Sequence, residues 1–341
     1  MLKQTVGAVL AAAMLTLGAG AVAADAKVLK YTHFQPGKPD QPKHAAAVAF
    51  KEHVEKATNG SIKVELYPAS QLGNANQVLE GLRLGSIELG VVHDGGIPTI
   101  YKPFNIFGLP FVFPDHATAY AVLDGPFGNE FAEDMRKKTG VRLMGYADNG
   151  IRHFTNSKRT VRTPEDMKGM KMRVQPSPVF VKLVESLGMS ASAIDWGELP
   201  AALAQKTVDG QENSVTNIMA ASLYQHQKYA TLDGHVYSLH AYLVSDRFFS
   251  RLSDAEKKAV TEGVDKAKKI HRDMTRAQDL EAKDVLAKNG MEVTELTPAQ
   301  IDAFRKVTQP AVRAWLESEP GNKEWVAKML AAVDTASKAR K

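Results

Sequence analysis

Two arginines in the middle third of the chain have side chains well suited to hold an anion. Arg173 lies in GMKMRVQPSP (169–178), where apolar and polar residues alternate and prolines follow, so the pattern predicts a short strand with Arg173 on its polar face. Arg152 lies in NGIRHFTN, at the start of another predicted strand. A guanidinium is a planar, permanently charged fork that fits a carboxylate through two hydrogen bonds. Neighbouring strands could point both arginines at one carboxylate; alternatively, each arginine forms a structural ion pair with a nearby Asp or Glu.

Other polar and aromatic residues of this region could complete a binding cleft. Trp196, in IDWGELP, precedes a predicted helix and could form a wall of the cleft or simply pack in the core. Asn213 follows Glu212 at the end of VDGQEN, a predicted turn or short strand; an asparagine at a turn can also serve only the turn itself. Gln175 is followed by a Pro-Ser-Pro turn, which would hold its side chain at the edge of the cleft.

Common local motifs for hydrolysis, metal binding and nucleotide binding do not occur in the sequence, which has no GxSxG, HExxH, P-loop or GxGxxG. The nearest histidine groups, His93 with Asp94 and His226 with His235 and His240, lack the i, i+4 spacing of a helical metal pair. We therefore assign no catalytic residue, no metal and no cofactor. Because catalytic triads are assembled in space, a secreted lyase or hydrolase acting on organic acids remains an alternative.

Alternating strands and helices must position these residues, and they predict an α/β protein with crossover helices. Strands are expected at 27–34, 61–68, 85–92, 141–147, 151–157, 169–175, 190–195 and 235–245, and helices at 44–57, 75–84, 115–123, 127–138, 177–187, 196–206, 214–224 and 321–338. A further helix begins at the capping box Thr297–Gln300. The longest helix, 254–288, starts at the capping box Ser253–Glu256 and would reach roughly 50 Å, enough to bridge two lobes.

Composition and the N-terminus indicate an exported, folded protein of about two domains. Of the 341 residues 44% are hydrophobic and 24% charged, and the net charge of +5 is too small and dispersed for a nucleic-acid-binding surface. Residues 1–24 combine Lys3, an uncharged apolar stretch and a small-residue site, the layout of a secretory signal peptide cleaved near Ala23 or Ala24. An uncleaved membrane anchor is the alternative. Without any cysteine the protein has no disulfide, no Cys-ligated metal and no lipidated N-terminal cysteine, so we expect it in the periplasm.

Two long segments resemble the extracytoplasmic solute-binding subunit of TRAP transporters, the DctP family. They are NGIRHFTNSKRTVRTPEDMKGMKMRVQPSP (149–178) and IDWGELPAALAQKTVDGQENSVTNI (194–218), supported by LYPASQLG, GLPFVF and YLVSDRFFSRLSDAEK. The resemblance covers nearly all of the chain after the signal peptide. It implies a two-lobe periplasmic-binding-protein-like fold, with hinge strands and a long helix spanning both lobes.

The resemblance also implies how the chain is divided and what it does. Lobe I would comprise 25–149 plus about 238–277, and lobe II 150–237 plus about 278–338. The protein would not be an enzyme; as a monomer, it would capture a small organic acid and deliver it to the small and large integral-membrane permease subunits. A ligand-binding component that serves a sensor kinase is a further alternative.

The family's ligand-contacting positions fall on particular residues here. The chief carboxylate-binding arginine corresponds to Arg173, the second arginine to Arg152, the asparagine to Asn213 and the pocket aromatic to Trp196. From the first lobe the resemblance adds four candidates, which are His93, Asp94, Phe34 and Gln35.

Some positions depart from the family's sialic-acid-binding members and bear on the ligand. His93 stands where several of those members carry an acidic residue, NAN at 74–76 replaces an acidic pair, and Pro200 replaces an aromatic. Sialic acid is therefore disfavoured. A C4-dicarboxylate is favoured, because His93 could meet a second carboxylate; sugar acids and aromatic or branched monocarboxylates are the alternatives.

Overall fold

A single mixed sheet of nine strands runs through the protein in the computed structural model, which describes residues 26–340. The strands are β1 (Lys27–Thr32), β2 (Ile62–Tyr67), β3 (Leu89–His93), β4 (Val141–Asn156), β5 (Lys171–Val174), β6 (Ser190–Ala193), β7 (Gly210–Ser214), β8 (Tyr229–Ser245) and β9 (Glu292–Glu295). Their order is β2-β1-β3-β8-β4-β7-β5-β6, with β9 also paired to β8. The predicted α/β class is confirmed.

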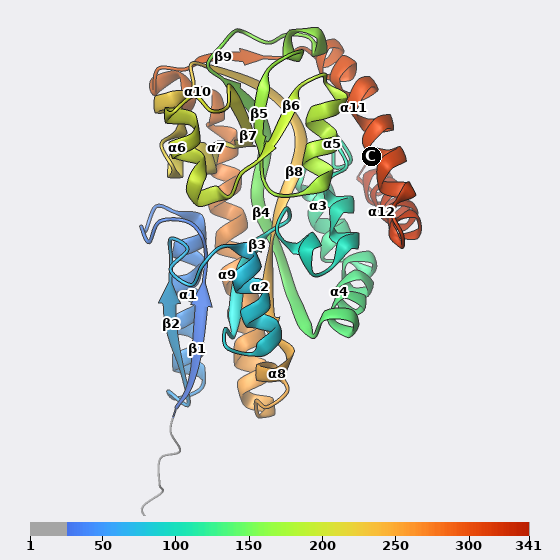
Figure 1. The fold of residues 1–341 in the computed structure, drawn as a ribbon. Coiled ribbons are helices and arrows are strands. Elements are labelled where there is room, and N and C mark those ends of the chain that lie inside the picture. The colour runs from blue at the N-terminus through green and yellow to red at the C-terminus, as the bar shows by residue number, and fades with distance from the viewer. Residues whose placement is uncertain (1–25, 341) are drawn as a thin grey trace, which may run out of the picture.

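Helices cover the sheet and divide into two groups (Figure 1). Their bounds are α1 (Pro42–Ala57), α2 (Ala75–Leu84), α3 (His116–Leu123), α4 (Pro126–Thr139), α5 (Pro178–Ser186), α6 (Leu199–Ala204), α7 (Val215–Ala220), α8 (Asp246–Phe249), α9 (Asp254–Leu280), α10 (Ala282–Lys288), α11 (Pro298–Ser318) and α12 (Asn322–Lys338). We call β1–β3 with α1 and α2 the first lobe, and β5–β7 with α5–α7 the second lobe. None of the described helices is both long and apolar enough to cross a bilayer. The predicted signal peptide lies outside the described residues.

Two long antiparallel strands, β4 and β8, connect the lobes (Figure 1). The prediction of separate strands at 141–147 and 151–157 is wrong, because β4 continues through both. Its pairing with β8 shifts register between Asp148 and Gly150, and Gly150 adopts a φ of 106°, a conformation that costs glycine little. This irregularity lets one strand serve both lobes.

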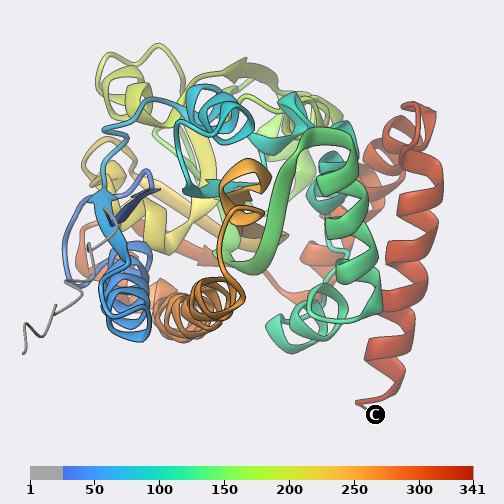
Figure 2. The same ribbon diagram turned by 90° about the horizontal axis from the view of Figure 1, so that it is seen from below.

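Helix α9 spans both lobes, as predicted, but it is shorter than expected. It starts at the predicted capping box, where the Glu256 amide donates to Ser253 Oγ (3.3 Å) and the Ser253 amide donates to Glu256 Oε2 (2.8 Å). It ends at Leu280, and residues after Glu281 form the separate helix α10. Helix α9 packs against α1 in the first lobe and reaches α7 in the second, and Figure 2 shows α1 and α9 side by side.

Helices α1 and α9 lie close together at Gly263. A Cβ at this position would lie 2.8 Å from Val54 Cγ2 and 3.0 Å from Phe50 Cδ2. We expect Gly263→Leu to lower the free energy of unfolding by about 1–3 kcal/mol, because the added atoms would push the two helices apart. Thermal melting checks this against Lys266→Leu, which places the same side chain on the exposed face of α9; equal melting temperatures for the two variants would contradict it.

Candidate ligand-binding site

A narrow cavity lies between the two lobes, beside the connecting strands. It contains about 340 Å³ of space not filled by atoms, part of which is open to solvent. It is lined by Phe34, Gln35, His93, Asn149, Arg152, Arg173, Gln175, Trp196, Asn213, Asn217 and His240. The lining thus includes eight of the nine predicted site residues, and Asp94 is the exception.

Arg173 is a buried cation without an ionic partner. Its side chain is 2% exposed, and its Nε donates to the Ile194 carbonyl (2.9 Å). Within residues 26–340 no carboxylate lies within 4.0 Å of its guanidinium, and Nη1 and Nη2 make no hydrogen bond. Burial, reinforced by the nearby Arg152 charge, lowers the pKa of Arg173 to about 10, so it stays protonated at neutral pH. A buried charge of this kind is stabilised when an anion binds it.

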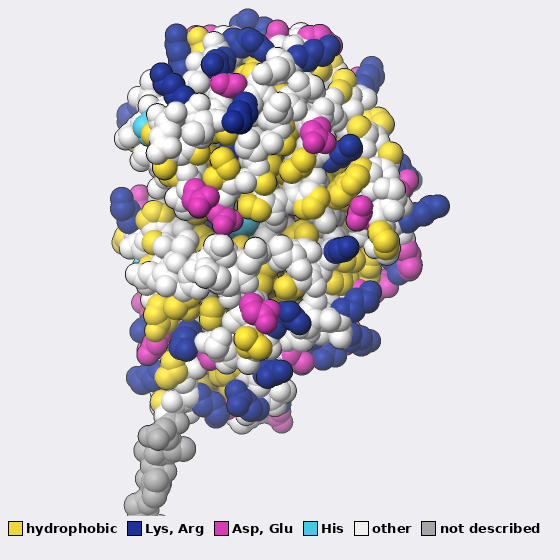
Figure 3. Space-filling view, viewed as in Figure 1, with side chains coloured by type: hydrophobic (Ala, Val, Ile, Leu, Met, Phe, Trp, Pro, Cys, Tyr) yellow, Lys and Arg dark blue, Asp and Glu magenta, His cyan; other side chains and the backbone are white. Residues whose placement is uncertain are grey.

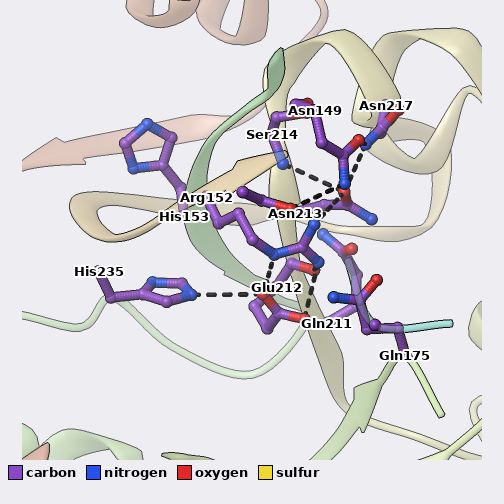
Figure 4. Close-up of polar contacts among 12 residues, drawn as sticks. Asn149, Arg152, His153, Gln175, Gln211, Glu212, Asn213, Ser214, Asn217 and His235 are labelled. Carbon is purple, nitrogen blue, oxygen red and sulfur yellow. Dashed lines mark hydrogen bonds and ion pairs between the residues drawn. The ribbon is translucent and has the colours of Figure 1, made fainter. Parts of the chain in front are cut away.

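Arg152, in contrast, is already paired (Figure 4). Its Nε donates to Glu212 Oε2, and its Nη2 donates to Glu212 Oε1 (2.8 Å) and to the Glu212 carbonyl (2.6 Å). Both side chains are almost fully buried, at 1% and 0% exposure. For each arginine the sequence allowed either ligand binding or a structural ion pair. Arg152 lines the cavity, but its guanidinium forms such an ion pair with Glu212.

The ion pair continues into a buried network behind the cavity. His235 Nε2 lies 3.3 Å from Glu212 Oε2, His235 Nδ1 lies 2.9 Å from Asp233 Oδ2, and the ring stacks on Phe154. Burial alone would lower the pKa of His235, but the two carboxylates outweigh it and raise this pKa to about 9. Burial would likewise raise the pKa of Glu212, but Arg152 and His235 hold it below its usual value. Two cations and two anions thus balance within the network.

Side-chain amides connect Arg152 to the opposite lobe. Asn213 Oδ1 accepts from Arg152 Nη1 (3.1 Å) and from Asn217 Nδ2 (2.8 Å). Asn217 Oδ1 accepts from Gln35 Nε2 and from Lys43 Nζ (3.2 Å), both of the first lobe. These contacts hold the second lobe closed against the first.

Asp94 lies behind the cavity and supports Gln175. Its Oδ1 accepts from Gln175 Nε2 (3.1 Å), and its Oδ2 accepts from Ser238 Oγ (2.7 Å) and the Leu239 amide (3.1 Å). The Gly95 amide is a fourth donor to this carboxylate, and Asp94 is only 3% exposed. Because its oxygens are already occupied and buried, Asp94 has little access to a ligand. Its position indicates a supporting role rather than direct ligand contact.

The remaining wall is aromatic and uncharged. The ring of Phe34 packs edge-to-face with that of His93, with 5.9 Å between the ring centroids. Trp196 is half-buried and packs against the core. Burial, followed by the charges of Arg173 and Arg152, lowers the pKa of His93 to about 3, and burial also lowers the pKa of His240 well below its usual value. Both imidazoles are therefore neutral at pH 7 in the ligand-free protein, and each carries one donor and one acceptor nitrogen.

Sequence reasoning missed three lining residues, Asn149, Asn217 and His240. Asn217 lies four residues after Asn213, and His240 is the register partner of His93 on the neighbouring strand. The spacing could have suggested Asn217, but His240 needs the pairing of β3 with β8, which the sequence does not show. No group of His, Asp and Glu in residues 26–340 is arranged to hold a metal ion.

Comparison with known proteins identifies the family. The model of the DctP family, bacterial extracellular solute-binding protein family 7, matches residues 33–319. A solute-binding protein of Verminephrobacter eiseniae is 36% identical over 80% of each chain. The C4-dicarboxylate-binding periplasmic protein DctP of Rhodobacter capsulatus is 30% identical, with 90% of this chain and 92% of that chain covered.

Solved structures share the fold. The sugar acid binding protein DctPAm from Advenella mimigardefordensis, in complex with galactonate, has a TM-score of 0.86 and 31% identity, covering 91% of this chain and 99% of that chain. A TRAP periplasmic solute binding protein from Polaromonas sp. JS666, bound to D-erythronate, has a TM-score of 0.83 and 30% identity, with coverage of 89% and 98%. Proteins of this family are periplasmic substrate-binding proteins of transporters and not enzymes. The chain therefore belongs to the DctP family of TRAP transporter solute-binding proteins, as its motifs predicted.

Proposed function

We propose that this protein captures a small organic acid in the cavity between its lobes, with Arg173 binding the ligand carboxylate. The observation that carries the proposal is the buried Arg173 guanidinium, whose Nη1 and Nη2 have no partner within residues 26–340. A carboxylate can accept from both nitrogens at once and neutralise the charge. Relatives of similar fold support the ligand class, since galactonate and D-erythronate are both carboxylates.

Closure of the lobes would bury the bound acid. Gln35 with Asn217 and Gln175 with Asp94 link the lobes across the cavity in this structure. We propose that these contacts separate in an open form that admits the ligand. The hinge would lie near Gly150, with lobe I formed by 25–149 and about 238–277, and lobe II by 150–237 and about 278–338.

The cellular role follows from the family. The protein would be exported, cleaved near Ala23 or Ala24, and released as a periplasmic monomer that delivers its ligand to the small and large permease subunits. Figure 3 shows acidic and basic side chains interspersed on one face of the molecule.

Thermal melting with a set of carboxylates tests the proposal. An acid that binds only the folded protein stabilises it by about 2.7 kcal/mol at a hundredfold excess over its Kd, enough to raise the melting temperature by several degrees. The matched controls are the corresponding amides, which lack the negative charge and should give no shift. Equal shifts with an acid and its amide would contradict the role of Arg173, and conversion of the bound acid over hours would favour an enzyme.

A further inference from the structure

We infer that the ligand is a hydroxylated monocarboxylate, with one carboxylate at Arg173 and hydroxyl groups that donate to amide oxygens of the cavity lining. The inference rests on the proposed function and differs from the C4-dicarboxylate that the sequence favours. It depends on two properties of the lining, its charge and the direction of its hydrogen bonds.

The cavity lining presents one uncompensated positive charge. Arg152 is neutralised by Glu212, and the network behind it is balanced by His235 and Asp233. Lys43 lies behind Asn217 and does not line the cavity. A second carboxylate on the ligand would therefore be buried without a cationic partner, which is costly.

The side-chain amides of Asn213, Asn217 and Gln35 form a series of hydrogen bonds that starts at Arg152. The charged groups beside this series determine which atom of each amide donates and which accepts. Arg152 has only donors, so it requires the oxygen of Asn213 to face it. Asn217 then donates through Nδ2 to that same oxygen, which leaves its own oxygen to accept from Gln35 Nε2. Lys43 Nζ donates to the same Asn217 oxygen (3.2 Å) and supports this assignment.

This direction leaves acceptors on the first-lobe side of the cavity. Gln35 is 4% exposed, and its Oε1 is buried without a hydrogen-bond partner among the described residues. A further acceptor lies on the second lobe, two residues after Arg173: Gln175 donates its Nε2 to Asp94, which leaves its Oε1 as an acceptor. An ionised carboxylate has no proton to give these oxygens, whereas a hydroxyl can donate to either.

Donors gather on the Arg173 side of the same cavity. Arg173 has two guanidinium nitrogens, Nη1 and Nη2, that make no hydrogen bond within residues 26–340. The Nδ2 of Asn213 is also without a hydrogen bond in this range, and Figure 4 shows Asn213 beside the Arg152 guanidinium. Neutral His93 can donate or accept, as a hydroxyl requires. The lining therefore offers the Arg173 nitrogens to a carboxylate and the amide oxygens of Gln35 and Gln175 to hydroxyl groups.

Calorimetry with matched acids tests the inference. The set compares erythronate with succinate and butyrate at four carbons, and galactonate with adipate and hexanoate at six. We expect a hydroxylated acid to bind at least about tenfold more tightly than the dicarboxylate and the unsubstituted acid of its length, because buried polar groups reject ligands that leave them unpaired.

A variant isolates the acceptor. Gln35→Met removes the unpaired oxygen and also the hydrogen bond from Gln35 Nε2 to Asn217, which affects both acids alike. Binding of the hydroxylated acid should therefore weaken by about tenfold more than binding of the unsubstituted acid of equal length. Equal losses for both acids would show that Gln35 acts only through the structure of the site, and would contradict the inference.

The outcomes separate this inference from the proposed function. Tighter binding of a dicarboxylate, lost in Arg173→Ala, would overturn the inference and leave the proposed function standing. Absence of binding by both hydroxylated acids would overturn the inference whatever the other acids do. Binding that Arg173→Ala leaves unchanged would overturn the proposed function itself.

Discussion

Arg173→Ala is expected to weaken binding of the ligand acid by about 2–4 kcal/mol, or roughly 30- to 1000-fold, measured by calorimetry. The loss is large because a carboxylate brought into a closed cavity needs a buried charge to meet it, and Arg173 is the unpaired cation of the described lining. Arg173→Lys should also be costly, since an ammonium cannot reproduce two parallel hydrogen bonds.

Two controls separate a binding defect from misfolding. Lys171→Ala removes an exposed cation from the same strand and should leave affinity unchanged. The ligand-free Arg173→Ala protein should melt no lower than the wild type, because the substitution removes an unpaired buried charge. Wild-type affinity in Arg173→Ala would contradict the site assignment.

Glu212→Gln is expected to cause the largest loss of stability, about 3–5 kcal/mol. Glu212 is fully buried and faces both Arg152 and the His235 imidazolium, so the substitution leaves two cations close together with the Asp233 carboxylate alone to balance them. Thermal melting should show a decrease of many degrees in the absence of ligand.

The matched control is Glu185→Gln, which neutralises an exposed carboxylate on α5 and should change the melting temperature little. Adding Arg152→Met to Glu212→Gln should recover part of the loss, because the unpaired cation is then gone. A melting temperature of Glu212→Gln equal to that of the wild type would show that the network does not stabilise the fold.

The sequence predicts the elements that depend on local patterns. The capping box at Ser253 correctly starts α9, because two reciprocal hydrogen bonds between residues three apart need no distant partner. The alternation around Arg173 correctly predicts β5. The break at Glu281 was missed, since its cause is not a proline or glycine that the sequence would mark.

Other predictions that failed, or that the sequence could not make, depend on long-range pairing. The two strands predicted on either side of Asp148 are one strand because β8 pairs along both of them. The sequence also does not show which arginine has an ionic partner. The partner of Arg152, Glu212, is sixty residues away on β7, and only the antiparallel pairing of β4 with β7 brings the two side chains together. The same reason hides the link between Gln175 and Asp94, eighty-one residues apart.

A crystal structure with the tightest-binding acid tests the central claim most directly. We expect the ligand carboxylate to accept from both Nη1 and Nη2 of Arg173 at about 2.7–2.9 Å, while Arg152 keeps its pairing with Glu212. A bound acid whose carboxylate lies away from Arg173, with that guanidinium still unpaired, would contradict the account.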